Sequence, residues 1–483
     1  MSRFYTFLLI LFAQCLFANN YYVSAEMGDD DNHGLSVEYP FLTIQIAADL
    51  TRPGDTVFIM DGVYTNTNMY NVFSIVNWGV EDAWITYTAL PGHHPKLEFT
   101  SFDGIGVFGA CYVEISGLEI QGANDETTLD FALDNRLNLD VPQVRGRGIT
   151  IGPAFGIDPH HIRLKNNKIY KCGGSGVHTY LTDYITIENN EVFQCGWYSP
   201  LLESGIHLIQ NKNSDAYNGV KNFIRNNYTH SNFTYVPGIF NNTFYNGDGI
   251  LIEDTRHIFS NTDIPAYEGI TLIENNITFN NGGSGISVLQ SDNIWIINNT
   301  AYKNMMNPGY DSYQIGAFLS GDILMLNNII VTNTDGLAYG CYDCESFNGD
   351  YNLIYNTNFF PFLGANDITG VDPLFKKPSR NPLDADFSLL DGSPALNVAL
   401  VENSATYDFF GNRRKITPDL GAIERMEEII TDCEAGAVFG AAEKTVFFIC
   451  SDNGETNNLE FYNSSNSEVN YAYIITDLSL IHI

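Results

Sequence analysis

The stretches HIRLKNNKIY (residues 161–170), DYITIENNEVF (183–193), GITLIENNITF (269–279) and DNIWIINNTAY (292–302) share one pattern. In each, alternating apolar residues lead into an Asn-Asn pair, and a second short run follows. The alternation indicates a β-strand with one buried face. The asparagine pair indicates a tight corner, because asparagine tolerates left-handed backbone. Such a side chain can bond its counterpart on a stacked strand about 4.8 Å away.

The spacing of these corners sets the fold class. Asparagine pairs begin at 166, 189, 226, 275, 298 and 327, so the steps are 23, 37, 49, 23 and 29 residues. Glycine-led phrases follow the corners: GSGVHTY (174–180), ESGIHLI (203–209), GDGILIE (247–253) and GSGISVL (283–289). A unit of about 23 residues with three short strands and no helical period predicts one coil of a parallel β-helix. The predicted fold is therefore all-β, with a single stack of coils.

Both ends of the chain differ from the repeats. Arg3, the apolar run 4–17 and the small Ala18 predict a signal peptide at 1–18. An amphipathic helix at 40–50, with Thr43 near its start, would cap the open edge of the stack in a β-helix domain spanning 19–425. Residues 426–483 change composition and predict a partial C-terminal β module. We expect a secreted or cell-surface monomer, attached through that module.

The two ends also carry a family resemblance. The opening phrase, from YYVSAEMGDDDNHG (21–34) to PGDTVFIMDGVYT (53–65), and the closing phrases DGSPALNV (391–398) and PDLGAIE (418–424) resemble the termini of secreted right-handed β-helix proteins. These proteins form the pectate-lyase-like superfamily, and the resemblance covers about 20–425. It implies the fold more than the activity, because the superfamily includes lyases, hydrolases, epimerases and adhesins.

The charge limits the partners. Fifty-seven acidic residues against 23 basic ones give a net charge of −34, which repels nucleic acid and anionic lipid. We expect no nucleic-acid partner and no membrane span. Uronate polymers are repelled as well, so an acidic polysaccharide would need a local cation cluster or a divalent metal.

Stacking the coils in register predicts an active face. His178 and His207 then share one outward column about 4.8 Å apart, where they could divide the base and acid roles of a lyase. Arg256 is a third catalytic candidate, since arginine is the base in some β-helix lyases, where its pKa must be lowered. The predicted substrate-binding residues are Arg147, Tyr180, Glu203, Trp197 and Tyr267; the two last come from long inserts whose aromatic rings could stack on sugars.

The phrase GDGILIEDTRH (247–257) is the densest polar stretch. Asp248, Glu253 and Asp254 could supply oxygen ligands to calcium, the predicted cofactor. Some pectate lyases of the superfamily carry an acidic Asp-Gly calcium site followed by a lysine. Here Glu253 stands where that lysine is expected, so their catalytic base does not carry over at this position.

The sequence therefore favours a calcium-assisted lyase that cleaves a uronate polysaccharide by β-elimination. A glycoside hydrolase is the first alternative, because Asp248 with Glu253 or Glu203 could form a carboxylate pair. A non-catalytic glycan-binding adhesin is the second, favoured by the C-terminal module and the missing lysine.

Overall fold

The structure, a computed structural model, describes residues 18–240, 242–309, 312–426, 458–459 and 473–474. The chain divides into two units, 1–425 and 426–483. In the second unit, β34 (Asn458–Leu459) pairs antiparallel with β35 (Tyr473–Ile474). The predicted signal segment 1–17 and the rest of the C-terminal module lie outside the described residues. Across the part that the structure describes, no helix is both long and apolar enough to cross a bilayer.

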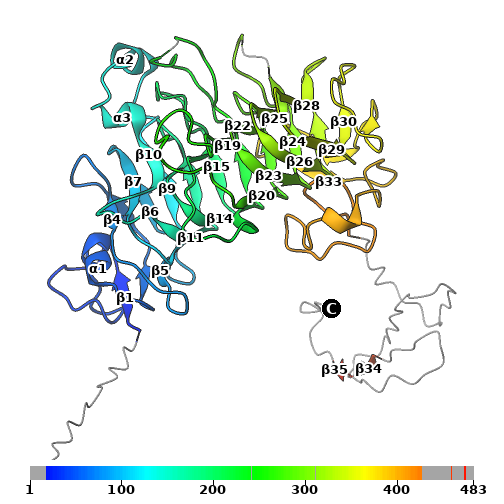
Figure 1. Ribbon diagram of the computed structural model, residues 1–483. Coiled ribbons are helices and arrows are strands. Elements are labelled where there is room, and N and C mark those ends of the chain that lie inside the picture. The colour runs from blue at the N-terminus through cyan, green and yellow to red at the C-terminus, as the bar shows by residue number, and fades with distance from the viewer. Residues whose placement is uncertain (1–17, 241, 310–311, 427–457, 460–472, 475–483) are drawn as a thin grey trace, which may run out of the picture. The chain divides into compact units, whose positions relative to one another are not determined.

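The first unit is the predicted right-handed parallel β-helix (Figure 1). Sheet A stacks β1 (Asn20–Val23), β2 (Thr56–Ile59), β5 (Ile85–Ala89), β8 (Val113–Ser116), β11 (His160–Lys165), β14 (Asp183–Glu188), β17 (Val220–Arg225), β20 (Ile270–Glu274), β23 (Asp292–Ile297), β26 (Gly321–Leu326) and β29 (Phe347–Asp350). Sheet B stacks β3 (Val63–Thr65), β6 (Lys96–Glu98), β9 (Glu119–Gln121), β12 (Lys168–Tyr170), β15 (Glu191–Phe193), β18 (Tyr228–His230), β21 (Ile277–Phe279), β24 (Thr300–Tyr302), β27 (Ile329–Val331), β30 (Leu353–Tyr355) and β31 (Ile368–Thr369). Sheet C stacks β4 (Phe73–Ile75), β7 (Asp103–Phe108), β10 (Arg147–Gly152), β13 (Val177–Tyr180), β16 (Ile206–Ile209), β19 (Ile250–Glu253), β22 (Ile286–Leu289), β25 (Tyr313–Phe318) and β28 (Leu337–Tyr342).

The asparagine pairs form the corners between sheets A and B. The first asparagine of each pair adopts a positive φ, as at Asn166 (54°) and Asn226 (56°). The second is buried and donates to the next one along the stack; Asn227 Nδ2, for example, lies 3.0 Å from Asn276 Oδ1. Each buried amide thereby finds a partner, which a buried polar group requires.

The interior of the coils is a continuous apolar column. Inward positions of sheet C stack in register, with Ile149, Val177, Ile206 and Ile250 all fully buried. No single coil could bury these side chains alone, so the stack owes its stability to this shared column.

The N-terminal end is closed as expected. Helix α1 (Ile44–Leu50) covers the N-terminal edge, with Thr43 as its N-cap residue and the Thr43 hydroxyl directed to Asp30. Two further helices, α2 (Leu129–Asp134) and α3 (Pro142–Arg145), lie before β10. Beyond the last coil, β32 (Phe375–Lys377), β33 (Asp386–Leu389) and the 3-10 helix η1 (Val401–Asn403) belong to a closing segment, residues 372–425, that packs on sheet B.

The enlarged connections border sheet C on both edges. Segments 194–205 and 231–249 enter β16 and β19, while segments 210–219 and 254–269 leave these strands for sheet A. The last two segments therefore also border sheet A, and this decides where polar side chains can gather.

Candidate functional site

The predicted histidine column is present on sheet C. Residues 178 and 207 are register partners of β13 and β16, and their rings lie 5.2 Å apart and nearly perpendicular. The register prediction for His178 and His207 is confirmed. Both side chains are largely covered, with exposed fractions of 9% and 3%.

Each histidine has a different neighbour. His207 Nε2 lies 2.8 Å from Glu253 Oε2, while its buried Nδ1 has no hydrogen-bond partner among the described residues. Burial, followed by the charges of Arg147 and His207, holds the pKa of His178 well below its usual value. His178 is therefore neutral near pH 7. Glu253, predicted as a metal ligand, orients an imidazole instead.

Three predicted substrate-binding residues lie on this face. Arg147 Nε donates to Glu203 Oε1 at 2.5 Å, and Glu203 Oε2 is buried without a described hydrogen-bond partner. The Tyr180 hydroxyl accepts a bond from Asn261 at 2.6 Å. Arg147 and Glu203 thus form an ion pair, so neither offers an unpaired charge to an acidic polysaccharide.

The predicted calcium ligands do not converge. Asp248 accepts bonds from Ser204 and from the amide of Ser284, and burial raises the pKa of its carboxyl to about 7. Asp254 instead accepts the amides of Ile258 and Phe259 and so shapes its own loop. Within the described residues, no group of three His, Cys, Asp or Glu side chains could hold a metal ion. The set Asp248, Glu253 and Asp254 does not fit calcium.

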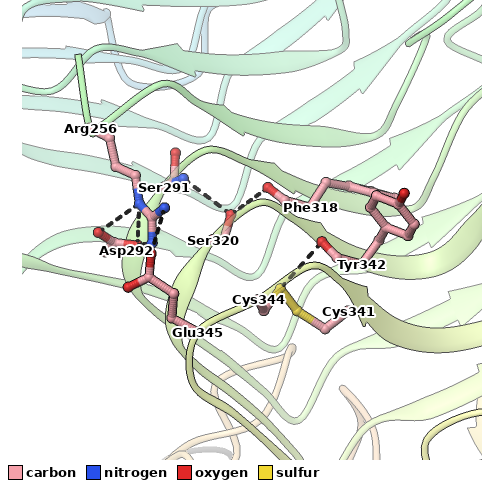
Figure 2. The surroundings of a disulfide bond; sticks show 9 residues. All are labelled: Arg256, Ser291, Asp292, Phe318, Ser320, Cys341, Tyr342, Cys344 and Glu345. Carbon is pink, nitrogen blue, oxygen red and sulfur yellow. Dashed lines mark hydrogen bonds and ion pairs between the residues drawn. A yellow bond between two sulfur atoms is a disulfide. The ribbon is translucent and has the colours of Figure 1, made fainter. Parts of the chain in front are cut away.

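The surroundings of Arg256 do not favour its predicted role as a base. Its Nε lies 2.8 Å from Asp292 Oδ1, and its Nη1 lies 3.3 Å from Glu345 (Figure 2). These carboxylates, Asp292 first, raise the pKa of Arg256, whereas a base requires a lowered one. Glu345 directly follows the disulfide Cys341–Cys344.

The two predicted sugar-stacking aromatics are also engaged. Tyr267 is 2% exposed, and its hydroxyl donates to Asp183 at 2.6 Å, so its ring offers no face to a sugar; this prediction is wrong. Trp197 is half-buried, donates to the carbonyl of Ser231 and packs edge-on against Tyr235.

A second polar cluster, absent from the sequence predictions, lies on sheet A. Lys221 has a fully buried side chain, and its Nζ lies 2.9 Å from Asp183 and 2.8 Å from Asp215. Asp183 is buried and also accepts from Tyr267, whereas the side chain of Asp215 is 49% exposed. The rings of Tyr184 and Tyr267 also lie near the amine, 4.9 Å and 5.7 Å from it, and Asp215 is the most exposed member of the group. We call Lys221, Asp183, Asp215 and Tyr267 the lysine cluster.

The lysine cluster borders an aromatic and cationic surface. The rings of Tyr112, His161 and Tyr184 stack along sheet A, with centroids 4.5 Å and 4.2 Å apart. The Tyr184 hydroxyl donates to Asp215 at 2.8 Å. Arg163, 41% exposed, lies 3.7 Å over the Trp84 ring. Burial, followed by the charge of the neighbouring His160, lowers the pKa of His161 to about 4.

A local signal for Lys221 exists in the sequence. The phrase GVKNFIR (219–225) interrupts an apolar alternation with a lysine, and the strand register shifts there, between Val220 and Asn222. A β-bulge redirects a side chain and often lies beside an active site. The partners of Lys221 come from other coils, however, and no spacing rule predicts them.

Comparisons with known proteins agree with this architecture. A family model described as "Pel9A-like, right handed beta helix region" matches residues 21–328. The crystal structure of pectate lyase Pel9A has 16% identity and a TM-score of 0.51, over 84% of this chain and 96% of that chain. A rhamnogalacturonan lyase has 15% identity and a TM-score of 0.38, over 86% and 97% of the two chains.

A GH136 lacto-N-biosidase from Eubacterium ramulus has 15% identity and a TM-score of 0.41, over 70% of this chain and 56% of that one. The search of curated proteins finds no match. At these identities the structural likenesses concern the fold alone. The family match covers well over half of the 483 residues, and the chain therefore belongs to the Pel9A-like right-handed β-helix family.

Proposed function

We propose that this protein is a polysaccharide lyase that cleaves an acidic, uronate-containing polysaccharide by β-elimination, with Lys221 as the base. The observation that carries the proposal is a completely buried lysine amine paired with the buried Asp183 and the half-exposed Asp215. Lysine is almost never fully buried unless it is paired, and some buried lysines serve as general bases. The shared fold with pectate lyase Pel9A supports the substrate class.

The chemistry requires a base and a positive field. The base removes the proton at C5 of the uronate, the C4–C5 double bond forms, and the 4-O bond breaks with its electron pair on the leaving oxygen. Arg163, which lies 3.7 Å from Glu114, and Lys212, which pairs with Asp158, are partly exposed cations on this side of the stack. To attract a uronate carboxylate, each would exchange its present partner for it. Displacing Asp215 would leave the amine paired with Asp183 alone.

The assay identifies the reaction class directly. Purified protein is incubated with pectate, alginate and glycosaminoglycans. New ultraviolet absorbance from an unsaturated uronate indicates a lyase, and new reducing ends without that absorbance indicate a hydrolase. Retained binding with neither product indicates an adhesin and contradicts the proposal.

A charge-preserving variant tests the base. Lys221→Arg keeps a cation between Asp183 and Asp215, but a guanidinium gives up its proton far less readily than an amine. We expect kcat to fall by about 10²–10⁴-fold, the usual contribution of a general base. His207→Asn serves as the comparison, with kcat within about tenfold of the wild type. The reverse pattern would place the base on the histidine column of sheet C, where His207 Nδ1 lacks a described partner.

A hydrolase is the second candidate function, favoured by one carboxyl group. Burial raises the pKa of Asp248 to about 7, so it still carries a proton near neutrality, as a general acid must. Asp248→Asn would abolish the release of reducing ends by a hydrolase and leave a lyase centred on Lys221 active.

Calcium remains a proposal that rests on the net charge of −34 alone, because the predicted ligand set does not fit. A divalent cation would reduce the repulsion between this chain and a polyuronate. We expect a calcium chelator to lower the rate on polymeric substrate and added calcium to restore it. An unchanged rate after chelation would contradict this part of the proposal.

A further inference from the structure

The first asparagine of each corner pair points its amide away from the core, and these outer asparagines form a ladder of their own. The closing segment covers three of them. Asn327 accepts from the amide of Leu400 at 2.8 Å and donates to its carbonyl at 3.0 Å. Asn298 and Asn275 likewise each make one donor and one acceptor bond with the closing segment.

Beyond Asn275, the outer asparagines of the described residues make no hydrogen bond with the closing segment. The next outer asparagine, Asn226, has a buried Oδ1 with no hydrogen-bond partner among the described residues. It borders a cavity of about 270 Å³ whose lining is Asn189, Asn190, Glu191, Asn226, Tyr228 and Phe409. That volume is slightly below the roughly 300 Å³ at which ordinary small-molecule pockets begin, so it admits a single ring.

The lining defines the chemistry of an occupant. Tyr228 and Phe409, with ring centroids 6.4 Å apart, supply apolar surface, and the unpartnered Oδ1 of Asn226 offers an acceptor. The amide of Asn190 is already bonded within the row of buried corner asparagines. Glu191 is an ionised acceptor: burial alone would raise its pKa, but the neighbouring His230 and Lys168 lower it. Its carboxylate lies 3.8 Å from Lys168 and 3.5 Å from His230, neither of which lines the cavity, so Glu191 is the one charged group among the six lining residues.

We propose that this cavity binds one neutral sugar residue, at the corner of sheets A and B and outside either candidate catalytic face. An apolar ring face with amide and carboxylate groups at its edge matches the mixed apolar and hydroxyl surface of a pyranose. The site would hold a neutral branch or a neutral unit of a polysaccharide. Sugar binding in this cavity requires no catalytic activity, so this proposal can be refuted or supported independently of the lyase proposal.

The test uses saturation-transfer NMR on the full chain with D-galactose, D-xylose and L-rhamnose, and with D-galacturonate as the contrast. Asn226→Gly removes the unpartnered amide at a φ of 56°, which glycine adopts without strain. Asn166→Gly is the matched control, because Asn166 occupies the same ladder position at a φ of 54° and does not line the cavity. Glu191→Gln keeps the shape and removes the charge.

We expect at least one neutral sugar to bind, binding to weaken about tenfold or more in Asn226→Gly, and Asn166→Gly to match the wild type. Glu191→Gln should weaken neutral sugars and raise the affinity for galacturonate. Absence of binding by all three neutral sugars overturns the proposal, as does equal loss in both glycine variants. Binding of a synthetic peptide that copies residues 399–409, without sugar binding, would identify a peptide-docking strip instead and also overturn it.

Discussion

The lysine cluster on sheet A and the histidine column on sheet C occupy two faces of the same coils, yet their buried atoms are satisfied very differently. Asp183 accepts five hydrogen bonds, two of them from Ser214 and one each from Tyr184, Lys221 and Tyr267. On sheet C, by contrast, Glu203 Oε2 and one ring nitrogen each of His178 and His207 are buried without a described hydrogen bond.

The comparison shows that the hydrogen bonding of a site's buried groups and the exposure of its side chains are separate properties. The network around Lys221 holds the amine in a fixed place, and Asp215 is its one half-exposed member. The histidine column has unpaired atoms, each costing about 1–3 kcal/mol. The side chains of Lys221, His178 and His207 are all largely covered, so the two sites differ in how their buried groups are bonded and not in how deeply these lie.

The sharpest contrast should appear in stability. Lys221→Met leaves the buried Asp183 carboxylate without its cation, which should destabilise the fold by about 3–5 kcal/mol. His207→Gln should cost less than about 2 kcal/mol, because the ring already has an unpaired nitrogen. Urea unfolding monitored by circular dichroism measures both. Equal losses would show that the two faces do not differ in the way we describe.

The pH dependence of stability in Asp248→Asn tests the buried carboxyl group on the sheet C side. The folded pKa of about 7 lies above the ordinary value of 3.8, so the stability that Asp248 contributes is complete below pH 4 and is lost as the pH rises through 7. The free energy of unfolding that is lost in this way amounts to at most about 4 kcal/mol. We expect the variant to gain on the wild type between pH 5 and pH 9 in thermal melts. If the stabilities of the wild type and the variant changed with pH in parallel, this would contradict the raised pKa of Asp248.

The sheet A side should respond to pH in the opposite direction. His161 has a folded pKa of about 4, below its ordinary 6.5, so its contribution is present above pH 6.5 and is lost as the pH falls through 4. His161→Tyr keeps a ring between Tyr112 and Tyr184 but does not titrate in this range. The variant should lose less stability than the wild type on acidification, by less than the Asp248 effect because the ring is partly exposed. Equal losses of stability in the wild type and in His161→Tyr on acidification would refute this.

The smallest effect is expected at Arg256, the third catalytic candidate predicted from the sequence. Its bonds to Asp292 and Glu345 lie at the surface, so Arg256→Gln should cost no more than about 1 kcal/mol. The catalytic rate should not change, and steady-state kinetics on the active polymer checks this. A rate loss beyond tenfold would restore Arg256 as a candidate.

The repeat pattern predicted most of the fold because its determinants are local. Each Asn-Asn corner requires a left-handed residue and a buried amide, and both requirements can be read within one coil. The register of His178 with His207 followed from counting residues after the glycine turns, since parallel strands in phase place equivalent positions side by side. The helix at 44–50 followed from the need to cover an open edge.

The site could not be predicted in the same way. Lys221 meets Asp183 from the preceding coil, Asp215 from one long segment and Tyr267 from another. The long segments have no period, so their paths depend on packing against sheets that exist only after the coils have stacked. Tyr267 was misassigned for that reason: its sequence shows an aromatic residue in a long insert, and only packing buries its ring.

The sequence by itself determined the coil, its corners and the apolar column, because those depend on backbone conformation and on burial at regular intervals. Only the tertiary structure decided which charges neutralise one another. Coulombic and hydrogen-bond energies change steeply over a few ångströms and with burial. The distances between groups on different coils are fixed by irregular loops, which no repeat describes.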